Sequence, residues 1–194
     1  MNPYGLLERL GCYAWWICTR QLSPRPPPAV NGIELRTLER EELIAHCANA
    51  ALDVDAQKVQ ASLGRGELCV GALDASTLVG YAWFACQPAP HTAALWMEFD
   101  RRLVYVYRAF VAPGYRGRGI ASALYRQVDP LFLARGRTAA LLCIAFGNHA
   151  SLAAAQRSGA RVAGYCAYVQ AGRLFLHART RGAIRLGYRF YRPG

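Results

Sequence analysis

The chain has 194 residues, 54% of them hydrophobic, and a formal net charge of +11 at pH 7. This length and composition suit one globular domain with a sizeable core, and they exclude a largely disordered chain. No apolar run reaches the roughly 20 residues that a membrane-spanning helix needs, so we expect no such helix. The charge is uneven: residues 1–100 carry 7 basic and 11 acidic side chains, whereas residues 101–194 carry 16 basic side chains and one acidic side chain.

Seven cysteines lie far apart in the chain, and no two of them form a C-x-x-C pair. An odd number at irregular spacing is typical of reduced thiols rather than of a disulfide framework, so we expect a cytoplasmic protein. The four histidines are scattered as well. The sequence therefore predicts no metal site.

The N-terminal segment reads as an appendage to the main domain. Apolar side chains recur at helical spacing in residues 1–22, which predicts an amphipathic helix there. Because this helix carries Trp15 and Trp16, it suits a peripheral contact with a membrane, a homodimer contact or docking on the domain itself. Four prolines in residues 23–31 predict a stiff linker.

The main domain is predicted over residues 32–179, as a mixture of strands and helices. Strands are expected at 33–38, 67–73, 78–86, 103–111, 139–146, 161–169 and 173–179, and helices at 39–52, 53–63, from 120 onward and at 148–157. The continuous apolar run at 139–146 is typical of a strand buried on both faces. Residues 180–194 hold four arginines and no acidic residue, so we expect an Arg-rich C-terminal tail.

A glycine-rich loop, R-G-R-G-I-A at residues 116–121, lies between a predicted strand and a predicted helix. The first amides of a helix lack partners and carry partial positive charge, and glycine lets an anion come close to them. The loop therefore predicts a pyrophosphate site. It is not a P-loop, because Lys58 is the only lysine, and Ser122 stands where the third glycine of the dinucleotide fingerprint belongs.

This loop resembles the coenzyme A loop of the GNAT superfamily of N-acetyltransferases, whose signature is Q/R-x-x-G-x-G/A. A second match, N-H-A-S at residues 148–151, is similar to the Asn-x-x-Ala/Ser helix of that family, and Gly159 follows it at the expected distance. The order of the predicted elements is also the order of the family. The resemblance implies an α/β fold with a central mixed sheet of six to seven strands and about four flanking helices, to which the N-terminal helix is added.

The resemblance also implies the reaction, in which an acetyl or other acyl group passes from acyl-CoA to a small-molecule or peptide amine. Acetyl-CoA would lie between the strands at 103–111 and 139–146, which part in this family. A backbone N–H near Val111 would polarise the thioester carbonyl. The residues expected to bind the co-substrate are Phe110, Val111, Arg116, Gly117, Arg118, Gly119, Ile120, Ala121, Asn148 and Ser151.

The chain departs from the family at both acid–base positions. Tyr105 stands where the family has a glutamate, and Ala155 stands where it has a tyrosine. Because an attacking amine must lose a proton, some other group has to accept it. We name as candidate catalytic residues Glu98, Tyr107 and Tyr165, which fall near the expected site.

Cys143 lies on the strand expected to face CoA, which makes it a second route to catalysis as a nucleophile. The more common role for such a residue is a buried structural thiol, and this is the role we expect.

Two other functions remain open. One is an acyltransferase that takes its acyl group from acyl carrier protein, an acidic partner suited to the basic C-terminal half, and that makes a lipid-like product. The other is a non-catalytic CoA-binding module, which would fit the missing acid–base residues. We expect no specific nucleic-acid partner, because only the net charge favours one.

Overall fold

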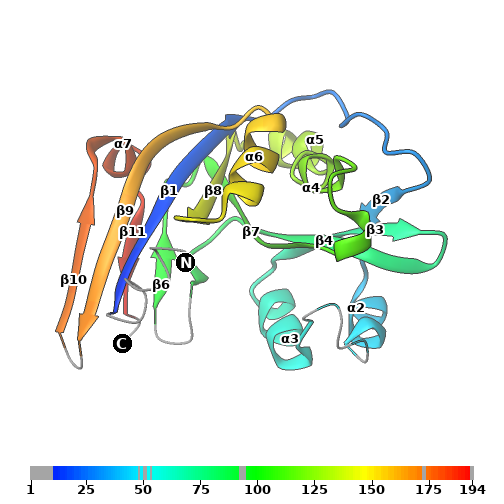
Figure 1. Ribbon diagram of the computed structural model, residues 1–194, viewed down its shortest axis with the longest axis horizontal. Helices are drawn as coiled ribbons and strands as arrows, with labels where there is room; N and C mark the ends of the chain where they lie inside the picture. The colour runs from blue at the N-terminus through cyan, green and yellow to red at the C-terminus, as the bar shows by residue number, and fades with distance from the viewer. Residues whose placement is uncertain are drawn as a thin grey trace.

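The structure is a computed structural model that describes residues 11–47, 49, 52, 54–91, 95–171 and 174–192. Within these residues the chain forms an eight-stranded mixed sheet and a three-stranded sheet (Figure 1). The large sheet has the order β10 (Leu174–Arg179), β9 (Arg161–Ala171), β1 (Cys12–Gln21), β8 (Ala139–Ala145), β7 (Leu103–Val111), β4 (Thr77–Ala85), β3 (Leu68–Asp74) and β2 (Glu34–Thr37). The small sheet has the order β11 (Arg189–Tyr191), β6 (Trp96–Glu98) and β5 (Ala89–Pro90).

Helices cover both faces of the large sheet, which confirms the predicted fold class. On one face lie α2 (Arg40–His46) and α3 (Ala56–Gly64), and on the other lie α4 (Ile120–Leu124), α5 (Asp129–Ala134) and α6 (His149–Arg157) (Figure 1). The short α7 (Arg181–Arg185) packs against β9. No helix in the described part of the chain is long and apolar enough to cross a membrane.

Two cores fill the layers on either side of the sheet, and β7 serves both. Its side chains alternate, so that Tyr105 and Tyr107 join the core on the side of α2 and α3, while Val104 and Val106 join the core on the side of α4. This period of two is the ordinary geometry of a β-strand, whose successive side chains point to opposite faces. Asn148 caps α6 as expected, because its side chain accepts a hydrogen bond from the Ser151 amide at 3.1 Å.

The N-terminal prediction was wrong over Cys12–Gln21, which form strand β1 and not a helix. β1 runs antiparallel to both β8 and β9 and lies between them. Its apolar residues point to both faces, with Ile17 in one core and Cys18 in the other, so the run satisfies helical spacing and strand spacing alike. The described part of the predicted appendage therefore belongs to the sheet. The predicted helix at residues 1–10 lies outside the described residues.

The C-terminal prediction was also wrong, because residues 180–192 belong to the domain rather than to a tail. β11 pairs with β6, and Tyr188 and Phe190 are buried in the core. The arginines of this segment suggested a solvated tail. They do lie at the surface, but the aromatic side chains between them point inward. The helix expected from residue 120 is likewise divided into α4 and α5, with Pro130 in the first turn of α5.

A buried ion pair fastens β1 to α5. Arg20 Nη1 and Nη2 lie 2.5 and 2.9 Å from the Asp129 carboxylate oxygens, and Nη2 also donates to the Tyr125 carbonyl at 2.6 Å. The Asp129 carboxylate accepts a further bond from the Ser23 amide at 3.1 Å. Arg20 is 5% exposed and Asp129 is 1% exposed, so neither charge is solvated by water if the other is removed.

We expect Asp129→Ala to lower the free energy of unfolding by about 3–5 kcal/mol, because it leaves the Arg20 guanidinium buried and unpaired. Urea unfolding measures this loss. The control is Arg102→Ala, which breaks the exposed pair with Asp100 and should cost less than about 1 kcal/mol. Equal losses in the two variants would contradict a structural role for the buried pair.

Candidate functional site

Strands β7 and β8 are paired along only part of their length. The parallel ladder joins Leu103–Val106 to Ala139–Leu142 and ends there. Beyond this point β7 stays paired with β4, and β8 stays paired with β1. Because each strand keeps its other neighbour, the two can part without leaving the sheet. Their facing edges then leave backbone N–H and C=O groups available to an extended ligand.

A β-bulge lies where the two strands part. Tyr81 pairs with Phe110 and Trp83 pairs with Tyr107, so β7 has one more residue than β4 between these pairs. Within the bulge, Arg108 has a φ of 46°, in the left-handed region that non-glycine residues rarely adopt. Bulges of this kind change the direction of backbone groups and are frequent next to active sites.

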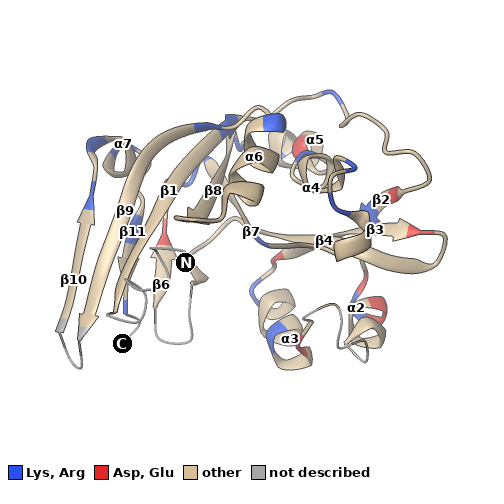
Figure 2. Ribbon diagram, viewed as in Figure 1, with Lys and Arg blue, Asp and Glu red and all other residues tan. Residues whose placement is uncertain are grey.

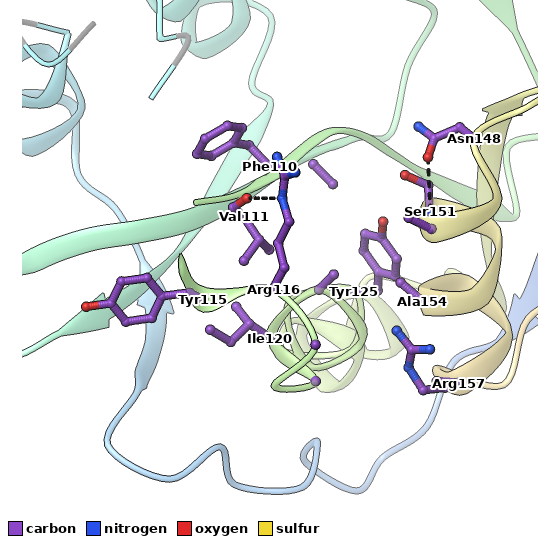
Figure 3. A pocket seen from close by; sticks show the side chains of 15 residues that line it. Phe110, Val111, Tyr115, Arg116, Ile120, Tyr125, Asn148, Ser151, Ala154 and Arg157 are labelled. Atoms are coloured by element: carbon purple, nitrogen blue, oxygen red, sulfur yellow. Dashed lines mark hydrogen bonds between the residues drawn. The ribbon is translucent and has the colours of Figure 1, made fainter. Parts of the chain in front are cut away.

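A cavity of about 340 Å³ lies between β7, the glycine-rich loop and α6 (Figure 3). All the residues predicted to bind the co-substrate line it, apart from Arg118. They come from three separate segments, residues 110–111, 116–121 and 148–151. The structure therefore gathers the predicted set around one hollow.

The loop obtains its shape from two glycines. Gly117 has a φ of 80° and Gly119 a φ of 84°, which a residue with a side chain adopts only at a cost. Gly119 is the N-cap of α4, and the Cβ of another residue there would meet only Ser122 Oγ, at 4.0 Å. The loop thus presents bare backbone to the cavity.

Two guanidinium groups face this cavity, of which Arg116 was expected and Arg157 was not. Arg116 lies along β7 and donates from Nε to the Val111 carbonyl at 3.1 Å, and Arg157 points from the last turn of α6 into the space beside α4 (Figure 3). Arg118 is turned away, since it donates to the Asn31 carbonyl at 3.1 Å and stacks on the Tyr115 ring. No carboxylate lines the cavity among the described residues, so the hollow favours an anion.

The prediction missed six residues that line the cavity: Ala109, Tyr115, Tyr125, Ala150, Ala154 and Arg157. Helical spacing would have found two of the side chains that matter. Tyr125 follows the predicted Ala121 by four residues, and Arg157 follows the predicted Ser151 by six, or two steps of three, so each lies near the helix face of a predicted residue.

The structure brings one of the three candidate catalytic residues, Tyr107, to the point where the strands part. Glu98 lies in the small sheet, where Arg189 Nη2 holds its carboxylate at 2.5 Å. Tyr165 lies on β9, is 47% exposed and faces the Phe146 ring. Tyr107 directly follows the last residue of β7 that pairs with β8.

The two positions at which the chain departs from the family offer no replacement. Tyr105 is buried beneath Phe99 and Tyr107, and this burial raises the pKa of its phenol well above the ordinary value. Ala155 is fully buried and has no group that can carry a proton.

The family is established by the sequence match. Residues 33–160 match the family described as Acetyltransferase (GNAT) family, and the chain belongs to it. No curated protein matches the chain.

Solved structures with the same fold agree with this assignment. A GNAT-family protein from Novosphingobium aromaticivorans has a TM-score of 0.56 and 19% identity, over 80% of this chain and 62% of that one. A GCN5-related N-acetyltransferase from Sphaerobacter thermophilus has a TM-score of 0.53 and 19% identity, over 98% and 56% of the two chains. An acetyltransferase of the GNAT family from Colwellia psychrerythraea has a TM-score of 0.52 and 18% identity, over 85% and 59%. The alignments thus cover about three fifths of these neighbours, and at such identities the likeness concerns the fold alone.

Cys143 fits the structural role better than the nucleophilic one. It lies 3.0 Å from the Tyr188 hydroxyl, and burial raises the pKa of its thiol well above the ordinary value. The thiolate, which is the reactive form, is therefore scarce at neutral pH.

We expect iodoacetamide to alkylate Cys143 at least about tenfold more slowly in the folded protein than in the protein unfolded in urea. Mass spectrometry of peptides taken at successive times measures the two rates. Equal rates in the folded and unfolded protein would contradict the structural role of Cys143 and favour its role as a nucleophile.

Proposed function

We propose that the protein transfers an acetyl group, or another acyl group, from acyl-CoA to an amine. The observation that carries the proposal is a single cavity that reaches from the glycine-rich loop to the bulge on β7. This shape suits a long ligand with an anionic end at the loop and a reactive end at the bulge.

The cavity offers a suitable partner to each part of acyl-CoA. The amides around Gly117 and Gly119, together with Arg116 and Arg157, would hold the pyrophosphate. The pantetheine arm would lie along Phe110 and Val111 and satisfy the backbone groups that β8 leaves free. A backbone N–H at the bulge would then stabilise the oxyanion that forms on the thioester carbonyl.

The reaction itself moves one acyl group and exchanges protons. The amine nitrogen attacks the carbonyl carbon and forms the C–N bond, after which the C–S bond breaks and its electron pair leaves with the sulfur. The nitrogen loses a proton, and the thiolate gains one.

The acceptor would approach from the face of the sheet that carries α2 and α3, because α4 and α6 enclose the donor on the other face. Acidic residues lie on α2 and near the ends of β2 and β3, and basic residues lie near α4, α6 and α7 (Figure 2). Exceptions include Arg40 on α2, Lys58 on α3 and the buried Asp129 on α5. A cationic amine, small or at the end of a peptide, suits this separation of charge.

Acyl carrier protein is a weaker choice of donor than CoA. The predicted N-terminal helix, which would have suited a lipid-like product, is not formed by Cys12–Gln21, and Trp15 is a core side chain. The basic surface still suits an acidic carrier. The glycine-rich loop, however, favours a ligand that brings its own pyrophosphate.

We expect acetyl-CoA to raise the free energy of unfolding by about 2.7 kcal/mol at a concentration of 100 times Kd. A thermal unfolding experiment measures this as a higher melting temperature. Gly119→Glu should abolish the shift, because it places a carboxylate in the loop and strains a backbone with a φ of 84°. The control is Gly114→Glu, which adds the same charge nearby, at a position with open space and outside the cavity. Failure of every CoA ester to stabilise the wild-type protein would rule out the proposed donor.

Arg118 and Arg157 give a second test, because the sequence predicted Arg118 at the site whereas the structure places Arg157 there. We expect Arg157→Ala to weaken CoA binding by about tenfold, through loss of a charge-assisted hydrogen bond. Arg118→Ala should change it by less than about twofold, because this side chain faces Asn31. Isothermal titration calorimetry with CoA measures both. The reverse ranking would show that the phosphates lie elsewhere.

A further inference from the structure

A cluster of polar side chains lies on the α3 side of the sheet, under the point where β7 and β8 part. It consists of Ser62, Arg65, Glu67, Tyr107 and Arg108, which come from α3, the turn before β3, and β7. The Tyr107 hydroxyl donates a hydrogen bond to Glu67 Oε2, and it lies 3.3 Å from Ser62 Oγ. Arg65 Nε and Nη2 lie 2.7 and 3.0 Å from the two oxygens of Glu67. Glu67 is 6% exposed, so its carboxylate is held almost entirely by these partners.

The position of Tyr107 connects this cluster to the cavity. Val106 is the last residue of β7 that pairs with β8, and Tyr107 comes next. The bulge residue Arg108 and the cavity-lining Ala109 follow at once. The phenol and the reactive end of the cavity therefore lie on opposite sides of the same short stretch of backbone, with the Tyr107 side chain facing the core of α3.

The bond between Tyr107 and Glu67 satisfies a buried phenol hydroxyl, and it also places that hydroxyl against a carboxylate. Arg65 contacts both carboxylate oxygens and thereby compensates the buried charge. The bond from Tyr107 is additional, and it links a carboxylate to the strand position at which the proposed reaction takes place. Arg108 covers the Tyr107 ring with its guanidinium 5.3 Å from the ring centroid, yet Arg108 is an exposed residue. An acceptor can reach the phenol by displacing this side chain.

We propose that Tyr107 accepts the proton of the acceptor amine while it passes its own proton to Glu67. This inference rests on the proposed acyl transfer and supplies the proton acceptor that the family positions lack. Tyr107 is the catalytic residue, and Glu67 is a positioning residue that orients the phenol and takes up its proton. As the C–N bond forms, the N–H proton moves to the phenol oxygen, and the phenol proton moves to Glu67. The C–S electron pair leaves with CoA, whose thiolate takes a proton from water, and Glu67 returns its own to water.

The state of the phenol agrees with a relay. Burial, followed by the nearby charge of Glu67, raises the pKa of Tyr107 to about 12. At neutral pH the phenol therefore keeps its proton, and it can take another only as it gives its own away. The charged and titratable groups that face the pair are Arg65 and Arg108. The Tyr105 phenol also faces it, stacked on Tyr107 with 5.2 Å between the ring centroids.

The test compares Glu67→Gln, Tyr107→Phe and the double variant with the wild-type protein. Thioester cleavage is followed with saturating acetyl-CoA and a broad panel of primary amines, and the variants are compared on the amine that the wild-type protein uses fastest, from mildly acidic to mildly alkaline pH. We expect each single variant to lower turnover by about 10²-fold, which is typical of a lost proton acceptor. The double variant should lose little more than either single variant, because the two residues act as a unit. Stabilisation by acetyl-CoA should not change, since neither residue lines the cavity.

The pH profile separates a proton acceptor from a merely structural residue. The relay ends on the Glu67 carboxylate, which Glu67→Gln replaces with a neutral amide that cannot take up the proton. Ionisation of the amine affects all variants alike, and the difference between the wild-type and Glu67→Gln profiles isolates the carboxylate. Tyr107→Phe leaves the Arg65–Glu67 pair intact and keeps the test valid if Glu67→Gln unfolds.

The matched control is Tyr105→Phe, which removes a neighbouring phenol on the same face of β7 and should keep turnover within about twofold of wild type. If Glu67→Gln and Tyr107→Phe both keep the turnover and the pH profile of the wild-type protein, the relay is overturned and the proposed acyl transfer is not. An equal loss in Tyr105→Phe would overturn it too. A wild-type protein that binds acetyl-CoA but cleaves it with no amine of the panel would overturn the transfer itself, and the relay with it.

Discussion

The cavity exists because β8 is hydrogen-bonded to β1 along its whole length. β8 leaves β7 after Leu142, and a strand without a second neighbour would there expose unpaired backbone groups on both edges. β1 supplies the second neighbour from Ala139 to Ala145 and is held in turn by β9 and by the Arg20–Asp129 pair. The part of the chain that looked like an appendage thus holds open the site on which the function depends.

The parted sheet separates two tasks that would interfere on one face. Binding phosphates calls for cations and bare amides, and these lie on the side of α4 and α6, with Arg116 and Arg157. Accepting a proton calls for a base that the acceptor amine can reach, and α4 and α6 enclose the donor on their side of the sheet. In the proposed mechanism Glu67 and Tyr107 act from the side of α3, and only the reacting groups meet between the strands.

Departure from the family at Tyr105 and Ala155 does not by itself indicate a non-catalytic module. The first position holds a buried phenol stacked on Tyr107, and the second packs in the core against α4 and β8. A proton acceptor need only be near the acceptor amine, and it can reach that place from another strand. Glu67 comes from the turn before β3, which a search limited to β7 and α6 does not include.

The sequence by itself determined the features that depend on a few neighbouring residues. A positive φ needs only a glycine at that position, as at residues 117 and 119. A free amide at the start of a helix needs only a polar side chain nearby, as at Asn148. The apolar run at 139–146 specifies a strand buried on both faces. The tertiary structure alone decided which elements meet. Apolar residues on both faces of Cys12–Gln21 satisfy a helix or a strand until β8 and β9 are in place beside them. Tyr107 meets Glu67 across 40 residues of chain, and such a contact follows from the order of strands in the sheet, which no short stretch of sequence contains.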